Sequence, residues 1–145
     1  MPSSSSALAE LAPGVSAAGA LDRSDIEALA QAGIRTIINN RPDGEDPGQL
    51  PAAEARRIAE GLGIAYHHIP VTAASLSRAD VDAFAAVLAT APTPLVAHCR
   101  SGTRSALLWA LARMREGADP MALVADAARH GIDIAALPAI ASRLR

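Results

Sequence analysis

The sequence predicts a single α/β domain whose core is a mainly parallel sheet of four to five strands flanked by helices. Short β-branched and apolar runs alternate along the chain with segments that have helical spacing. Glycine or proline stands at most junctions between them. The chain has 145 residues, 50% of them hydrophobic, which suits one domain with its own core. We therefore expect a flexible N-terminus over residues 1–12 and one domain over residues 13–145.

Four segments have the composition of strands. Residues 34–38 are rich in β-branched side chains. Residues 95–97 form an uninterrupted apolar run, as a parallel strand buried on both faces does. Residues 64–71 and 15–18 complete the predicted sheet.

Helices are expected between these strands and after the last of them. Their starts carry capping residues, which are Asp22, Ser77 followed by Asp80, and Asp119 followed by a proline. Glycines fit the position just past several helix ends. The expected helices run from Asp22 to Gly33, over 51–62, from Ser77 to before Pro92, and over 105–116, 119–130 and 134–143.

Composition excludes several classes of partner. The net charge is −2, there is no lysine and aromatic residues are few, so we expect no nucleic-acid partner. No stretch approaches the roughly 20 apolar residues of a membrane span, and the first residues do not resemble a signal peptide. A single cysteine fits a reducing cytoplasm. His67 and His68 are adjacent and point to opposite sheet faces, so we expect no metal site, and no cofactor is indicated.

Residues 98–105 are the stretch around which the chain is organised. They read His-Cys-Arg-Ser-Gly-Thr-Arg-Ser and join an expected strand to an expected helix. Such a junction binds anions, because the first N–H groups of a helix have no intrahelical partner. A cysteine there favours the thiolate form, which is a nucleophile. The alternative is that Cys99 is merely a small core residue.

Two further polar loops leave the same edge of the predicted sheet. Residues 39–48 follow one strand and contain Arg41 and Asp43, and residues 72–77 follow another. Ligands in open parallel sheets lie outside the carboxyl ends of strands, so the 39–48 loop should face the cysteine loop. Turn formation alone also explains its Asn, Asp, Pro and Gly residues.

The chain resembles a known bacterial family over roughly residues 13–144. His98-Cys99 before the loop and Arg104-Ser105 after it are similar to the cysteine-dependent protein phosphatases, and residues 99–105 resemble the active loop of rhodanese-type sulfurtransferases. Together with residues 36–45 and 66–71, these motifs identify the chain as a member of the beta-lactamase-hydrolase-like phosphatase-like domain family, also called DUF442. The resemblance implies a dual-specificity-phosphatase-like fold.

Two features favour sulfur transfer over phosphate ester hydrolysis. Four residues separate Cys99 from Arg104, where the phosphatase pattern has five, and a shorter loop makes a smaller ring of N–H donors. Phosphate ester cleavage also needs a general acid, yet residues 72–75 contain no carboxylate, although Asp43, Glu45 or Asp46 can substitute. We expect a sulfurtransferase that carries sulfane sulfur as a Cys99 persulfide. A Cys99-dependent phosphatase and an inactive anion-binding module remain alternatives.

Roles follow for the candidate residues. Cys99 is the nucleophile, Arg104 binds the oxyanion, Ser105 can hydrogen-bond the thiolate and Asp43 is a candidate acid. The chain has no second thiol, so an anionic sulfur donor and an external thiol acceptor are expected. The resemblance also implies a metallo-beta-lactamase-like persulfide dioxygenase as a partner. The expected substrate-binding residues are His98, Arg100, Ser101, Gly102, Thr103 and Arg41.

Overall fold

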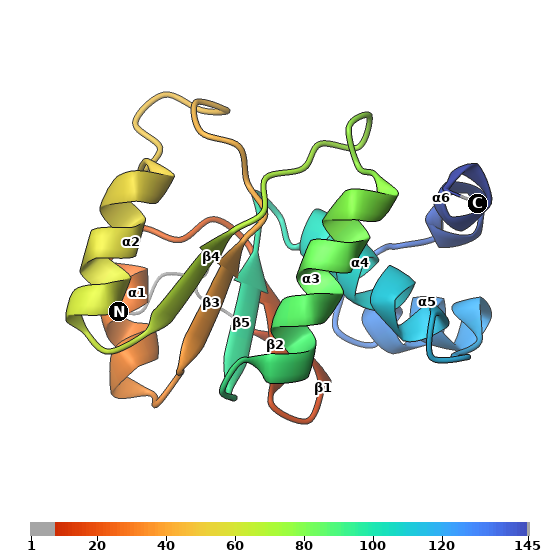
Figure 1. Cartoon of the computed structure of the whole chain (residues 1–145), viewed down its shortest axis with the longest axis horizontal. Coiled ribbons are helices and arrows are strands. Elements are labelled where there is room, and N and C mark those ends of the chain that lie inside the picture. The colour runs from red at the N-terminus through yellow and green to blue at the C-terminus, as the bar shows by residue number, and fades with distance from the viewer. Residues whose placement is uncertain (1–7, 145) are drawn as a thin grey trace.

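The computed structural model of the chain describes residues 8–144, which form one five-stranded sheet with helices on both faces (Figure 1). The strand order is β1-β2-β5-β3-β4. The edge strand β1 is antiparallel to β2, and all other neighbours are parallel. The strands are β1 (Ala9–Ala12), β2 (Val15–Ala18), β3 (Thr36–Asn39), β4 (Ala65–His68) and β5 (Leu95–His98).

The central strand β5 places its carboxyl end level with those of its neighbours. His98 lies opposite Ala18 of β2 and opposite Asn39 of β3. The segments that leave β3, β4 and β5 therefore emerge at the same edge of the sheet (Figure 1). This edge is where ligands of open parallel sheets are expected to bind.

Consecutive residues of the central strands supply two separate cores, because side chains alternate across a strand. Ile37 and Val96 pack beneath the helices α1 and α2, whereas Ile38 and Ala97 pack beneath the helices of the opposite face (Figure 1). The helices are α1 (Arg23–Gln31), α2 (Ala52–Gly61), α3 (Arg78–Thr90), α4 (Thr103–Met114), α5 (Pro120–Ala128) and α6 (Leu137–Arg143).

Helix α4 is the most enclosed of these helices. Residues 105–112 are all buried, so α4 packs against its surroundings on every side. The backbone of the β5–α4 junction is thus held between a buried strand and a buried helix.

The expected strands and helices are present, several of them with shorter bounds, such as Ala65–His68 within 64–71 and Leu137–Arg143 within 134–143. Two differences affect the architecture. Residues 9–12, which we expected within a flexible N-terminus, form β1 through a hairpin that turns at Gly14, where φ is 77°. Their Ala-Glu-Leu-Ala sequence has no strong strand propensity, so pairing with β2 decides their structure. Residues 1–7 lie outside the described part. Helix α4 begins at Thr103 rather than at Ser105, because Gly102, with φ of 96°, turns the chain directly into it.

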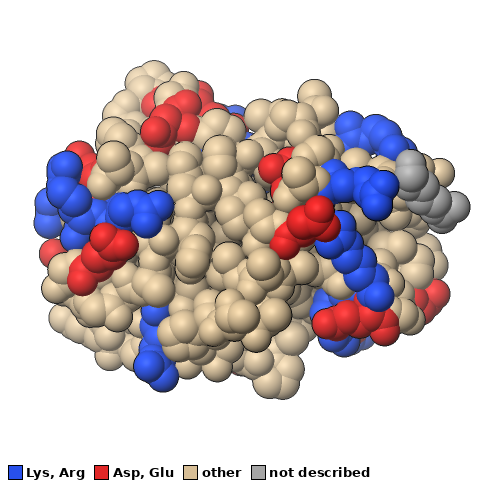
Figure 2. Space-filling view, in the orientation of Figure 1, with Lys and Arg blue, Asp and Glu red and all other residues tan. Residues whose placement is uncertain are grey.

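The surface matches the mixed composition. Figure 2 shows acidic and basic side chains interspersed on one face of the molecule. None of the helices in residues 8–144 combines the length and apolar character that a bilayer span requires. Within the same residues, no group of three or more His, Cys, Asp or Glu side chains is arranged to hold a metal ion.

Candidate active site

Cys99 follows β5 directly, and its side chain lies at the N-terminal end of α4. The backbone N–H of Gly102 donates to its Sγ over 3.1 Å. The residue is fully buried, with an exposed fraction of 0%. The sulfur therefore accepts a hydrogen bond at a helix N-terminus, an arrangement that stabilises negative charge on it.

Helix α4 lacks the side-chain cap that three other helices, α1, α3 and α5, have at their N-cap residue. Asp22, Ser77 and Asp119 cap α1, α3 and α5, whereas Gly102 at the start of α4 offers no side chain. No described residue accepts a hydrogen bond from the backbone N–H of residues 100, 101 or 103–105. An anion at the sulfur can use these donors without displacing a cap.

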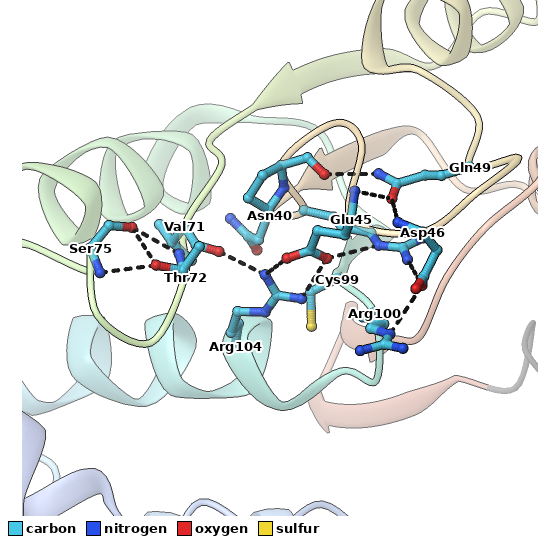
Figure 3. Close-up of polar contacts among 12 residues, drawn as sticks. Asn40, Glu45, Asp46, Gln49, Val71, Thr72, Ser75, Cys99, Arg100 and Arg104 are labelled. Carbon is cyan, nitrogen blue, oxygen red and sulfur yellow. Dashed lines mark hydrogen bonds and ion pairs between the residues drawn. The ribbon is translucent and has the colours of Figure 1, made fainter.

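Arg104, in the first turn of α4, is held by two other segments (Figure 3). Its Nη1 donates to Glu45 Oε2 over 2.7 Å and to the Val71 carbonyl over 2.8 Å, and its Nη2 donates to Glu45 Oε1 over 2.9 Å. A guanidinium has five N–H groups, so the Nε–H and one Nη2–H take no part in these three hydrogen bonds. Hydrogen bonding to Glu45 is the main cause that raises the pKa of Arg104, and the neighbouring Cys99 sulfur contributes to the same rise.

Glu45 is an ionised anchor for this arginine. The pKa of Glu45 is lowered to about 2, and the hydrogen bond from Arg104 is the largest cause. Arg41 lowers this pKa further, whereas burial acts to raise it. Arg41 donates from its Nε to Glu45 Oε1 over 3.0 Å. At neutral pH Glu45 is therefore a carboxylate between two guanidinium groups, and it cannot donate a proton.

A second ion-pair chain joins the same two loops. Asp46 pairs with the Nη2 of buried Arg41 and, over 3.0 Å, with the Nε of Arg100 (Figure 3). The Arg41 side chain is 8% exposed, whereas that of Arg100 is 64% exposed. The 39–48 loop thus faces the cysteine loop, as the sheet rule predicts.

Buried Asn40 connects the active loop to two strand ends. Its Oδ1 accepts from Ser105 Oγ over 2.8 Å, its Nδ2 donates to the Ile69 carbonyl over 2.9 Å, and its backbone N–H donates to the His98 carbonyl over 2.7 Å. The structure therefore places the Ser105 hydroxyl proton on Asn40 rather than on the sulfur. Asn40 was not among the site residues expected from the sequence, although its place just past a buried strand was a usable signal.

Asp43 acts at a helix start. Its Oδ1 accepts from the backbone N–H of Ala52 over 2.8 Å, at the first residue of α2, which has no cap from Pro51. The structure thus gives this carboxylate a capping partner at the start of α2. Thr72 and Ser75 hydrogen-bond each other in the loop after β4 (Figure 3).

His98 lies beneath the cysteine loop rather than in it. Burial is the main cause that lowers its pKa to about 4, while the Cys99 backbone opposes this in part. Its Nδ1 has no hydrogen-bond partner among the described residues. A neutral imidazole therefore supports the loop at neutral pH. Ser101 and Thr103 hydrogen-bond each other through their hydroxyls over 3.3 Å on the outer side of the loop.

The fold of this chain is that of a known class of protein. Solved structures of cysteine phosphatases share it. One is the kinase-associated phosphatase with its catalytic-site cysteine replaced by serine, which is 17% identical with a TM-score of 0.70 over 90% of this chain and 86% of that one.

The family follows from closer comparisons. Residues 7–116 match the family described as beta-lactamase hydrolase-like protein, phosphatase-like domain, and the chain belongs to it. A beta-lactamase hydrolase-like protein of Agrobacterium fabrum is 36% identical over 113 residues, which are 77% of this chain and 26% of the relative. A candidate phosphatase from Neisseria meningitidis is 34% identical with a TM-score of 0.83 over 94% of this chain and 96% of that one.

The comparisons bear on the expected chemistry. The chain spans about a quarter of the length of the curated relatives that it matches, 26% of one and 21% of another. The phosphatase-like fold and family support the phosphatase alternative better than sulfur transfer, which none of these relatives supports. The expectation of sulfur transfer was based on the loop spacing and on the lack of a carboxylate in residues 72–75. Neither feature describes the hydrogen bonds by which Glu45 and Val71 hold Arg104.

Proposed function

We propose that this domain is a cysteine-dependent phosphatase that hydrolyses phosphate monoesters through a phosphorylated Cys99. The observation that carries the proposal is the placement of the Cys99 sulfur, which accepts from the Gly102 N–H and faces the Arg104 guanidinium. The membership of a phosphatase-like family supports it.

The chain's own groups suggest two steps. In the first, the Cys99 thiolate attacks phosphorus, an S–P bond forms, and the bond from phosphorus to the leaving oxygen breaks with its electron pair on that oxygen. In the second, water attacks the phosphocysteine, the S–P bond breaks, and phosphate leaves with the thiolate restored. Backbone N–H groups of the loop and the free Nε and Nη2 hydrogens of Arg104 stabilise the equatorial oxygens.

The direct test is hydrolysis of 4-nitrophenyl phosphate by the purified protein. Wild type should release nitrophenol, and Cys99→Ser should release none above buffer, because an unactivated hydroxyl is a poor nucleophile. Arg113→Ala is the matched control, since it removes an exposed arginine at the far end of α4. Equal activity of wild type and Cys99→Ser would refute the proposal.

Sulfur transfer is kept as a second candidate because of one observation, the four-residue spacing between Cys99 and Arg104. Incubation with thiosulfate should then raise the intact mass by about 32 Da, one sulfur atom on Cys99. Cyanide should discharge this adduct as thiocyanate. The thiol acceptor and the metallo-beta-lactamase-like dioxygenase partner belong to this candidate alone, and a protein that forms no adduct would remove all three.

A further inference from the structure

We propose that the preferred substrates are phosphoanhydrides, in which the attacked phosphoryl group is bonded to a second, anionic phosphate. The inference rests on the proposed Cys99-dependent phosphatase function and extends it from phosphate monoesters to phosphoanhydrides. Two features carry it. The carboxylates of the 39–48 loop are all engaged, and Arg100 is a second cation beside the nucleophile that can be exchanged between partners.

Proton donation to a leaving group lacks a source in the two loops that hold Arg104, residues 39–48 and 72–75. Glu45 is ionised between Arg104 and Arg41, and Asp46 pairs with Arg41 and Arg100. Asp43 accepts from the first amide of α2. The 72–75 loop has hydroxyls that bond to each other and has no carboxylate. The leaving group must therefore depart as an anion that is stable without a proton.

Arg100 is suited to receive that anion. It directly follows the nucleophile in the chain, its side chain is 64% exposed, and within residues 8–144 that side chain pairs with Asp46 alone. Exposed ion pairs contribute little, so Arg100 can leave Asp46 at small cost. Asp46 then keeps Arg41, which is buried, so no carboxylate is left unpaired. A second phosphate bonded to the attacked one brings its charge to the place that Arg100 reaches.

The first step balances with inorganic pyrophosphate as the simplest case. The Cys99 thiolate forms the S–P bond to the unprotonated terminal phosphoryl group of HP₂O₇³⁻. The bridging P–O bond breaks, and its electron pair stays with the departing HPO₄²⁻. Water then cleaves the S–P bond, its oxygen and protons leave as H₂PO₄⁻, and the thiolate returns. An alkyl ester would instead release an alkoxide, which requires a proton that these loops do not supply.

The experiment compares phosphate release from pyrophosphate, 4-nitrophenyl phosphate, phenyl phosphate and glycerol phosphate by the whole chain. EDTA is present throughout to silence contaminating metal-dependent pyrophosphatases. We expect Cys99-dependent hydrolysis of pyrophosphate. The rate of ester hydrolysis should fall steeply from 4-nitrophenyl phosphate to phenyl phosphate to glycerol phosphate, because the leaving group becomes more basic in this order. Arg100→Ala should lower kcat/KM for pyrophosphate about tenfold more than for 4-nitrophenyl phosphate, the effect of losing one charge-assisted contact at an exposed site. Arg100→Lys should restore part of the lost preference for pyrophosphate over 4-nitrophenyl phosphate. Arg113→Ala should leave this preference as in wild type.

The outcomes separate the two levels of the proposal. Cys99-dependent hydrolysis of the aryl ester without hydrolysis of pyrophosphate would overturn the inference and leave the phosphatase function standing. So would equal rates for glycerol phosphate and 4-nitrophenyl phosphate, because they would reveal a proton donor. An unchanged substrate ratio in Arg100→Ala would also overturn it. Absence of Cys99-dependent hydrolysis of every compound would refute the phosphatase function itself.

Discussion

Replacement of Glu45 by glutamine tests how strongly this carboxylate holds the two arginines of the site. A pKa of about 2 instead of 4.5 corresponds to a stabilisation of about 3 kcal/mol for the ionised carboxylate. The Glu45 side chain is 22% exposed, and solvent screening lowers the expected contribution to about 2 kcal/mol. Glu45→Gln should therefore lower Tm at neutral pH by about 4–8 °C.

The pH dependence gives the sharper signature. Because the pKa of Glu45 is lowered on folding, its contribution is complete above pH 4.5 and is lost as the pH falls towards about 2. Within that window the unfolded chain binds a proton that the folded chain does not. The stability difference between wild type and Glu45→Gln should shrink across it, as measured by urea unfolding at several pH values.

Glu116→Gln is the matched control, since Glu116 pairs with Arg113 on the surface and its side chain is 64% exposed. It should change stability by less than about 0.5 kcal/mol. Equal stability of wild type and Glu45→Gln at neutral pH would refute the reasoning. So would a difference that stays constant from pH 4.5 to 2.

Three further predictions concern the supports of the site. Asp43→Ala should lower the free energy of unfolding by about 1 kcal/mol, measured by thermal unfolding, because α2 loses its cap at Ala52. If this variant instead loses the alkaline limb of the pH–rate profile, Asp43 is a general acid. His98, with its pKa lowered to about 4, should show no imidazole titration in NMR spectra between pH 5 and 8, and titration near its ordinary value of 6.5 would contradict its burial. Asn40→Ala should cost about 2–3 kcal/mol in urea unfolding, because it leaves buried polar partners, among them Ser105, without a hydrogen bond; a cost below about 0.5 kcal/mol would contradict this.

The architecture was predictable because its signals are local. Capping residues, β-branched runs and glycine stops act within a few positions, and they located every helix and four of the five strands. The meeting of the 39–48 and 99–102 loops was predictable from one topological rule, since both follow parallel neighbours of one sheet. Strand β1 was missed because its stability comes from pairing with β2 and not from its own sequence.

The charge pairing within the site was not predictable in the same way. Asp43, Glu45 and Asp46 lie in one short loop, and any of them can reach the cysteine loop when spacing alone is considered. The fold decides that Glu45 meets Arg104 and that Asp43 turns back to α2. Long side chains make this choice through tertiary contacts that no local pattern records.

The engaged arginines also determine what an incoming substrate must overcome. In the free protein Cys99 is fully buried, and carboxylates occupy Arg104 and Arg100. An oxyanion that replaces Asp46 on Arg100 gives up an exposed ion pair that contributes little and gains a charge-assisted contact with the substrate. The Nε and Nη2 hydrogens of Arg104 and the loop N–H groups add contacts without such an exchange. Binding should therefore favour groups that engage the free donors and Arg100 together, which requires more than one anionic centre.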